Sequence, residues 1–169
     1  MRILAGRFRG RNIATSRKLN YRPTQSRIRK SIFDRLTPFR YNSVLDLFAG
    51  SGIMGFEAAS RGSNFVTLVE NDKKCYNFLL ENSRKLEGAD FQIVYADAIR
   101  FLKNGRNFDL IFADPPYGHY DLDNLINITR DRLRNKGKFI LECEKQQKSY
   151  PDSTNIIYGD TQIMIWTKN

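Results

Sequence analysis

The chain has 169 residues, of which 41% are hydrophobic and 27% are charged. This length and composition predict one globular domain over residues 1–169 that needs no disulfide or metal staple. No apolar run approaches the about 20 residues that cross a bilayer, and no apolar core follows the N-terminal arginines, which argues against a membrane span and a secretory signal. Cys75 and Cys143 fit no metal-ligand spacing, so we expect two buried thiols in a reducing cytoplasm. The sequence leaves the oligomeric state open, with a monomer as the default.

The net charge of +10 is concentrated at one end of the chain. Residues 1–40 hold 12 Lys or Arg and one acid, whereas the other residues are close to neutral. Such a segment is typical of proteins that bind nucleic acid. Its content of Gly, Asn and Thr is unlike that of an amphipathic helix that binds membranes. We therefore expect a basic N-terminal extension over 1–40, the alternative being an arm that serves solubility alone. The candidate phosphate contacts are Arg7, Arg9, Arg11, Arg27 and Arg29.

Apolar periodicity predicts the secondary structure in chain order. Residues 1–27 look extended, with apolar anchors at Ile3, Leu4, Phe8 and Ile13, and residues 26–36 are expected to form a helix. The expected strands are 44–48, 65–69, 91–95, 108–113, 138–143, 156–158 and 162–166, and the expected later helices are 53–60, 72–86, 98–102 and 122–133. This alternation predicts a doubly wound, Rossmann-like α/β domain whose mostly parallel seven-stranded sheet ends in an antiparallel hairpin.

The first strand of this alternation leads into a glycine turn and a helix. Gly50, Gly52 and Gly55 fit the G-x-G-x-x-G pattern, and Glu70 ends the next strand 20 residues after Gly50. The pattern is typical of a cofactor with a ribose whose hydroxyls bond to the acid. By itself it leaves NAD, FAD and S-adenosylmethionine (SAM) open.

Acidic residues at the strand ends favour SAM among these cofactors. Asp46 lies four residues before Gly50, where a carboxylate would repel a pyrophosphate but attract the ammonium and sulfonium of SAM. The alternative is that Asp46 caps the loop. Asp97, after the third strand, is expected to accept a hydrogen bond from adenine, to cap the next helix, or both. The expected cofactor contacts from this part of the chain are Asp46, Ala49, Gly50, Gly52, Glu70, Asn71, Asp97 and Ala98.

Asp114-Pro115-Pro116-Tyr117 follows the apolar run Leu110–Ala113, a predicted buried strand. The four residues place a carboxylate and an aromatic ring beside two rigid prolines. This arrangement suits a flat base with an amine, because the ring stacks on the base and the acid accepts an N–H. The alternative is a simple strand-ending turn, since proline does not continue a central strand.

These motifs together resemble class I SAM-dependent methyltransferases and, more narrowly, the RsmD family of bacterial 16S ribosomal RNA guanine-N2 methyltransferases. The resemblance rests on residues 1–10, 22–33, 44–62, 114–117 and 158–161. It implies SAM as methyl donor, with further cofactor contacts from Arg22 and Thr24. It also implies 16S ribosomal RNA as substrate, either naked or within a partly assembled small subunit.

The same resemblance gives Asp114, Pro115, Pro116 and Tyr117 the catalytic positions. Asp114 and the Pro116 carbonyl would accept the two N–H groups of the amine, and Tyr117 would stack on the base. We expect His119, the single histidine, to be a loop residue, and we expect no metal site.

Three other functions compete with this one. A DNA adenine-N6 methyltransferase shares the Asp-Pro-Pro-Tyr motif but usually needs extra residues to recognise DNA. An NAD-dependent oxidoreductase shares the glycine pattern, whereas the basic segment and residues 114–117 serve no hydride transfer. A non-catalytic RNA-binding module explains the basic segment but not the acids at the strand ends.

Overall fold

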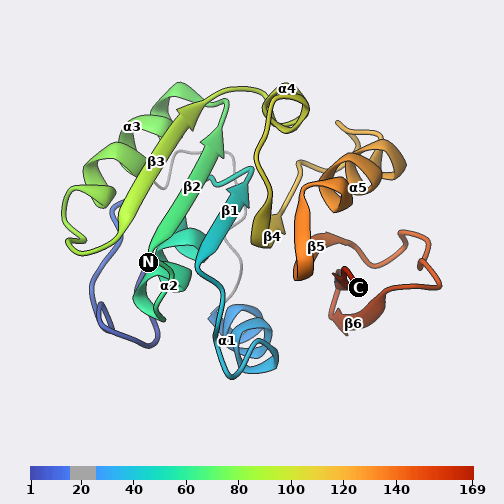
Figure 1. The fold of residues 1–169 in the computed structure, drawn as a ribbon, viewed down its shortest axis with the longest axis horizontal. Helices are drawn as coiled ribbons and strands as arrows, with labels where there is room; N and C mark the ends of the chain where they lie inside the picture. Colours follow the sequence, from blue (N-terminus) through green and yellow to red (C-terminus); the bar gives the residue numbers. More distant parts are fainter. Residues whose placement is uncertain (16–25) are drawn as a thin grey trace.

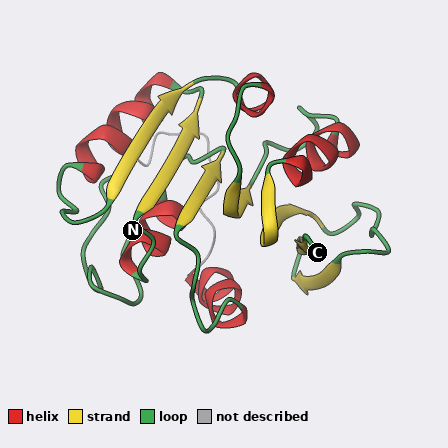
Figure 2. Cartoon of the chain, in the orientation of Figure 1, coloured by secondary structure: helices red, strands yellow, loops and turns green. Residues whose placement is uncertain are grey.

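The computed structural model describes residues 1–15 and 26–169 as a sheet covered by helices on both faces (Figures 1 and 2). The strands are β1 (Ser43–Leu47), β2 (Phe65–Glu70), β3 (Asp90–Tyr95), β4 (Phe108–Ala113), β5 (Leu133–Glu144), β6 (Thr154–Tyr158) and β7 (Thr161–Thr167). The helices are α1 (Ser26–Arg35), α2 (Ile53–Ser60), α3 (Lys73–Ser83), α4 (Ala98–Lys103) and α5 (Leu122–Asp131).

The strands form one seven-stranded sheet in the order β3-β2-β1-β4-β5-β7-β6. The pairs from β3 to β5 are parallel, and β7 is antiparallel to both β5 and β6. This topology confirms the predicted doubly wound α/β fold with its terminal antiparallel hairpin. No helix in the described part of the chain is both long and apolar enough to span a bilayer.

Successive residues of the parallel strands face opposite sides of the sheet, and each side packs against its own apolar layer. This is expected for strands that are covered by helices on both faces. Val44 and Phe112 pack with side chains from α1, α2 and α3 on one face. Leu45 and Ile111 pack with side chains from α4 and α5 on the other face. The two layers bury every residue of β1 and all of β4 except Asp109, which fixes the register of these strands and therefore the position of the residues at their ends.

The strand order reverses at β1, which lies between β2 and β4. Leu47 is paired in register with Val69 on one side and with Ala113 on the other, so the residues after these three emerge at one edge of the sheet. The arrowheads of β1, β2 and β3 point toward this edge in Figure 1. Ligands of open parallel sheets bind in the crevice at such a reversal point.

Several element boundaries differ from the predicted ones. β1 ends at Leu47, because Phe48 has a φ of 63° in the left-handed region. β5 begins at Leu133 rather than 138, because Leu133 pairs with Phe108 ahead of a register shift and the Lys136 amide donates to the Lys168 carbonyl at 2.7 Å. α3 ends at Ser83, before the predicted 86.

Residues 1–15 fold back on the domain and are not the extended arm that the sequence indicated (Figure 1, blue). Three of the four predicted apolar anchors, Ile3, Phe8 and Ile13, are buried in the same apolar layer as α2. The carboxylate of Glu57 in α2 accepts hydrogen bonds from the amides of Leu4 (2.7 Å) and Ala5 (3.1 Å). A buried acid and three apolar side chains therefore hold this segment in place.

Candidate active site

The turn after β1 has the backbone geometry that its glycines predict. Gly50 and Gly52 have φ values of 52° and 74°, which side chains of L-residues rarely adopt. A Cβ on Gly52 would lie 2.5 Å from Leu79, and one on Gly55 would lie 3.1 Å from Leu68. The glycines therefore allow both the tight turn and the close packing of α2 on β1 and β2.

Asp46 lies under this turn and is only 4% exposed. Its Oδ2 accepts the Gly55 amide at 2.8 Å, so the predicted capping role is present at the start of α2. Burial raises the pKa of Asp46 to about 7, the Gly55 hydrogen bond opposes this, and the nearby Glu70 carboxylate adds to it. A buried acid beside a second acid favours a cationic ligand and disfavours a phosphate.

Glu70, at the end of β2, fixes two turns at once. Its Oε2 accepts the Gly50 amide at 2.7 Å, and its Oε1 accepts the amides of Asn71 (2.8 Å) and Asp72 (2.7 Å). These bonds use three of the four acceptor positions of a carboxylate, which leaves one for a ligand hydroxyl. Sequence reasoning identified the position of Glu70 but did not reveal this role in shaping the turn around Gly50.

Asp97 follows β3 and begins α4. Its Oδ1 accepts the Arg100 amide at 3.0 Å, which is the predicted helix cap. Its Oδ2 accepts the hydroxyl of Tyr120 at 3.0 Å. Three further expected cofactor contacts lie on the same turns: Ala49 and Ala98 are buried, and Asn71 is exposed.

The Asp114–Tyr117 motif forms a turn at the same edge, directly after β4. Asp114 is half-buried and Pro115 is buried, whereas Pro116 is exposed and Tyr117 is 40% exposed. The Pro116 carbonyl accepts the His119 amide at 3.3 Å. The motif is therefore a strand-ending turn that also places a carboxylate and an aromatic residue at the edge of the sheet where β1 ends, so its two interpretations are compatible.

Four acidic residues from four parallel strands thus gather at one edge of the sheet: Asp46, Glu70, Asp97 and Asp114. Two other predicted cofactor contacts, Arg22 and Thr24, lie outside the described residues. His119 is an exposed loop residue, as its position in the sequence indicated.

Arg29 was a predicted phosphate contact, and the structure corrects this. Its side chain is 1% exposed, its guanidinium donates to the Arg2 carbonyl at 2.8 Å, and its Nε lies 3.8 Å from a Glu57 oxygen. Burial lowers the pKa of Arg29, and the charge of Glu57 opposes this. An interior side chain of this kind joins α1 to α2 and contacts no phosphate.

The other predicted phosphate contacts are exposed. Arg7 donates to the Gly88 carbonyl at 2.6 Å, and Arg11 donates to the Lys85 carbonyl at 2.5 Å. Both guanidinium groups also contact the Phe8 ring, with their carbons 4.8 Å (Arg7) and 5.7 Å (Arg11) from its centroid. Because residues 85–88 precede β3, this cluster lies at the amino end of the sheet, whereas Asp114 lies at the carboxyl end. Arg9 and Arg27 are exposed as well.

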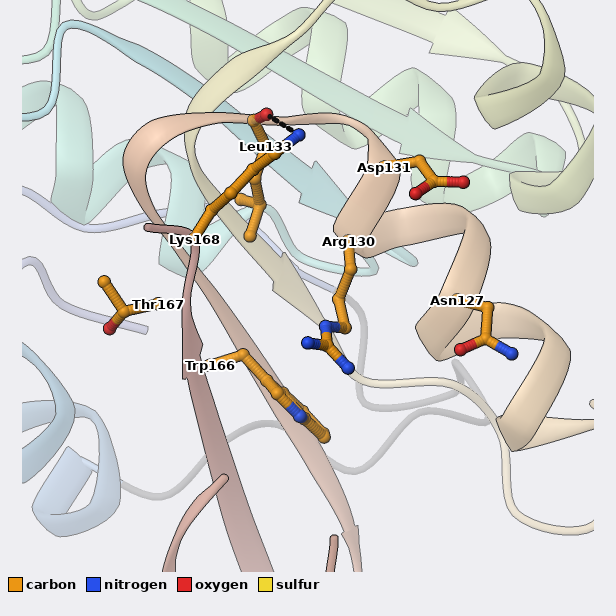
Figure 3. A pocket seen from close by; sticks show the side chains of 7 residues that line it. All are labelled: Asn127, Arg130, Asp131, Leu133, Trp166, Thr167 and Lys168. Atoms are coloured by element: carbon orange, nitrogen blue, oxygen red, sulfur yellow. Dashed lines mark hydrogen bonds between the residues drawn. The ribbon is translucent and has the colours of Figure 1, made fainter. Parts of the chain in front are cut away.

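A hollow of about 420 Å³ lies between α5 and β7 (Figure 3). Its lining includes Leu133, Trp166 and Lys168, and the Lys168 amine donates to the Leu133 carbonyl at 2.8 Å. Leu133 begins β5, so this hollow opens at the edge opposite Asp114. It is therefore separate from the cluster of strand-end acids.

Two residues at the crevice were missed by sequence reasoning. Tyr120 lies three residues after the Asp114–Tyr117 motif, but the sequence gives no sign of its hydrogen bond to Asp97. Phe48 looked like a strand residue, and only its left-handed backbone places its ring 4.8 Å from that of Tyr120.

Cys75 and Cys143 are buried, and burial is the main cause that raises the pKa of each thiol to about 12.

Comparison with known proteins connects this geometry to one family. The family model described as conserved hypothetical protein 95 matches residues 1–164. Ribosomal RNA small subunit methyltransferase D of Buchnera aphidicola is 36% identical over 150 residues, which cover 86% of this chain and 78% of the relative. The protein of the same name from Haemophilus influenzae is 39% identical over 128 residues, which cover 72% and 66%.

A solved structure agrees with these sequence matches. The Escherichia coli protein yhhF superposes with a TM-score of 0.88 at 29% identity, and the match covers 99% of this chain and 97% of that protein. The similarity therefore extends over the sheet, the crevice and the terminal hairpin.

Proposed function

This chain belongs to the family of ribosomal RNA small subunit methyltransferase D, the RsmD family, and we propose that it transfers a methyl group from SAM to the exocyclic N2 of a guanine in 16S ribosomal RNA. The observation that carries the proposal is the gathering of Asp46, Glu70, Asp97 and Asp114 at the reversal point of the sheet. A donor with positive charge and a base with an amine both suit such an edge.

The residues present fit SAM. Asp46 is buried with a pKa of about 7, so a neighbouring ammonium or sulfonium would stabilise its ionised form. Glu70 keeps one acceptor position for a ribose hydroxyl, and Asp97 keeps acceptor positions for an adenine amine. Ala49, Gly50, Gly52, Asn71 and Ala98 are further cofactor contacts in this proposal, and Arg22 and Thr24, which lie outside the described residues, are proposed contacts as well. When bound, SAM supplies an electrophilic methyl carbon on a sulfonium.

Asp114 and its neighbours hold the base in this proposal. The Asp114 carboxylate accepts one N–H of the guanine amine, which favours a tetrahedral nitrogen with an available lone pair. The Pro116 carbonyl has a second lone pair beside its bond to His119, and it accepts the other N–H. The Tyr117 ring stacks on the base, a contact worth about 1–3 kcal/mol. Pro115 is buried and fixes the direction in which these groups point.

A methyl-transfer assay tests the proposal directly. The purified protein is incubated with tritiated SAM and either partly assembled small subunits that contain 16S ribosomal RNA, an adenine-containing DNA duplex, or no nucleic acid. We expect label in the RNA alone. Label in DNA would support the adenine-N6 methyltransferase instead. Binding of RNA without transfer would support a non-catalytic module.

The exposed arginines supply the RNA affinity in this proposal. Arg7, Arg9, Arg11 and Arg27 hold phosphates, which gives a salt-dependent contribution with little sequence preference. The guanidinium pair over Phe8 is supported by its fixed geometry, and a hollow of about 230 Å³ between Arg11 and Lys85 adjoins it. RNA that reaches both this cluster and Asp114 spans a six-residue strand, about 20 Å.

The remaining parts of the proposal follow from the substrate. Residues 1–169 act as one methyltransferase domain, and the basic residues 1–40 contribute contacts to both RNA and cofactor. The protein works as a monomer in the cytoplasm, where ribosomal subunits are assembled. Its substrate is a partly assembled small subunit. Comparing transfer to naked 16S RNA with transfer to subunits reconstituted with increasing numbers of proteins tests the last point.

A further inference from the structure

Tyr120 contacts two of the turns that form the proposed cofactor pocket. Its hydroxyl donates to Asp97 Oδ2 at 3.0 Å, in the turn after β3. Its ring lies edge-on to the Phe48 ring at 4.8 Å, in the turn after β1. Tyr120 itself belongs to the loop that begins with Asp114. One side chain therefore connects the proposed base-binding loop to both turns.

Both contacts of Tyr120 should persist at neutral pH. Burial raises the pKa of Tyr120 to about 12, and the hydrogen bond to Asp97 and the charges of Asp97 and Glu70 add to this. The hydroxyl thus stays a donor at neutral pH. Phe48 keeps a left-handed backbone, which costs a residue with a side chain about 1–3 kcal/mol. Strain of this kind persists where surrounding contacts hold it, and the ring of Tyr120 is such a contact.

We propose that Tyr120 is a positioning residue that couples cofactor binding to the order of the base-binding loop. Through Asp97, its hydroxyl holds residues 117–121 against the cofactor pocket, so that Asp114 and Tyr117 are in place only when the pocket is organised. This inference rests on the proposed function. It adds a specific consequence: cofactor bound at Asp97 stabilises a loop that starts 17 residues later in the chain.

Hydrogen exchange with S-adenosylhomocysteine, the demethylated product, tests the coupling. In the wild type we expect the ligand to slow exchange both at residues 97–100 and at residues 117–121. In Tyr120→Phe we expect slowing at 97–100 to persist and slowing at 117–121 to be lost, with ligand affinity reduced about 2- to 10-fold. A purely structural role for Tyr120 would change loop exchange equally with and without ligand.

Tyr150→Phe is the matched control, because Tyr150 also donates its hydroxyl to a carboxylate, that of Asp123 in α5. It should retain ligand-induced slowing in both segments.

Two results would overturn the inference in different ways. Ligand-induced slowing at 117–121 that persists in Tyr120→Phe, or that is missing from the wild type while 97–100 responds, contradicts the coupling but leaves the proposed function intact. Absence of any response and of any binding heat in the wild type contradicts the proposed function, and the coupling fails with it.

Discussion

Asp46 accepts the Gly55 amide at 2.8 Å from a position that is almost completely shielded from water. The pair joins the carboxyl end of β1 to the first turn of α2. A single backbone donor does not compensate for the burial of a charge, and burial raises the pKa of Asp46 to about 7. The protein therefore maintains an unfavourable acid at the place where a cationic donor is proposed to bind.

Stability without cofactor should depend on pH through Asp46. Its pKa is 3.8 in the unfolded chain and about 7 in the folded protein. Between these values the folded state binds more protons, so the free energy of unfolding falls as pH rises and then levels above about pH 7. Asp46→Asn keeps an oxygen for Gly55 and should be more stable than the wild type at about pH 8, by at most about 4 kcal/mol.

Urea denaturation at about pH 5 and about pH 8 measures this difference, and calorimetry measures SAM binding to the same variant. We expect the gain in stability to accompany at least about a tenfold loss of SAM affinity, because a Coulomb attraction of about 1–4 kcal/mol is removed. Equal destabilisation of Asp46→Asn at both pH values would contradict the assignment.

Asp114→Ala should abolish transfer while SAM binding changes little. The carboxylate contacts the base in our account and lies on a different strand end from Asp46. Loss of an acceptor that acts in the transition state reduces kcat by at least about 100-fold. Single-turnover assays and SAM calorimetry check the two halves of the prediction. Asp160→Ala, at the exposed turn between β6 and β7, is the control and should retain both activities.

Glu57 holds the N-terminal segment, and its loss should destabilise the protein strongly. It is 0% exposed and accepts hydrogen bonds from Leu4, Ala5 and the Arg61 guanidinium. Glu57→Ala leaves the buried Arg29 without its counter-charge, which typically costs about 3–5 kcal/mol. Chemical denaturation measures the effect.

Glu81→Ala is the matched control for Glu57→Ala. Glu81 also pairs with a residue four positions later, Lys85 at 2.5 Å, but both side chains are exposed. Exposed pairs contribute about 0–1 kcal/mol, so we expect a small change. Similar losses in the two variants would show that the buried network is not what anchors residues 1–5.

The basic cluster at residues 7–11 should account for part of the salt dependence of RNA binding. Deleting residues 1–20 would also remove Ile3, Phe8 and Ile13 from the core, so point variants are the better test. The double variant Arg7→Gln, Arg9→Gln should weaken RNA binding. It should also reduce the slope of log binding constant against log salt concentration, by about 0.7 for each phosphate of a single-stranded RNA that is no longer neutralised. Filter binding over a range of salt concentrations measures this slope.

The control pair for this test is Arg100→Gln with Lys103→Gln. Both residues are exposed on α4, which packs on the opposite face of the sheet from α2. The charge change is identical, so a general effect of net charge should appear equally in both pairs. An unchanged slope in the Arg7 and Arg9 variant would remove this cluster from the RNA interface.

Sequence alone predicted most of the fold because its central strands are short apolar runs separated by amphipathic helices. The start of β5 escaped prediction, since Arg134 and Lys136 carry no apolar signal, and the extension of the strand depends on the pairing of Leu133 with Phe108 and of the Lys136 amide with the Lys168 carbonyl. Phe48 looked like strand because β-propensity gives no information on a left-handed backbone.

The four acids were predictable because each lies within two residues of the end of a parallel strand, and parallel strands end at one edge of the sheet. The role of Arg29 was not predictable, because the buried Glu57 that pairs with it lies 28 positions away in a different helix. The same reasoning explains Tyr120: a bond from one loop to the cap of another helix depends on tertiary structure that local patterns do not encode.

The most direct test is mass spectrometry of nucleosides from the 16S ribosomal RNA of partly assembled small subunits, after incubation with the protein and with SAM that carries a deuterated methyl group. Our account predicts deuterated N2-methylguanosine with the wild-type protein and none with Asp114→Ala. Label on adenosine, on another atom of guanine, or at equal level in the Asp114→Ala reaction would contradict it.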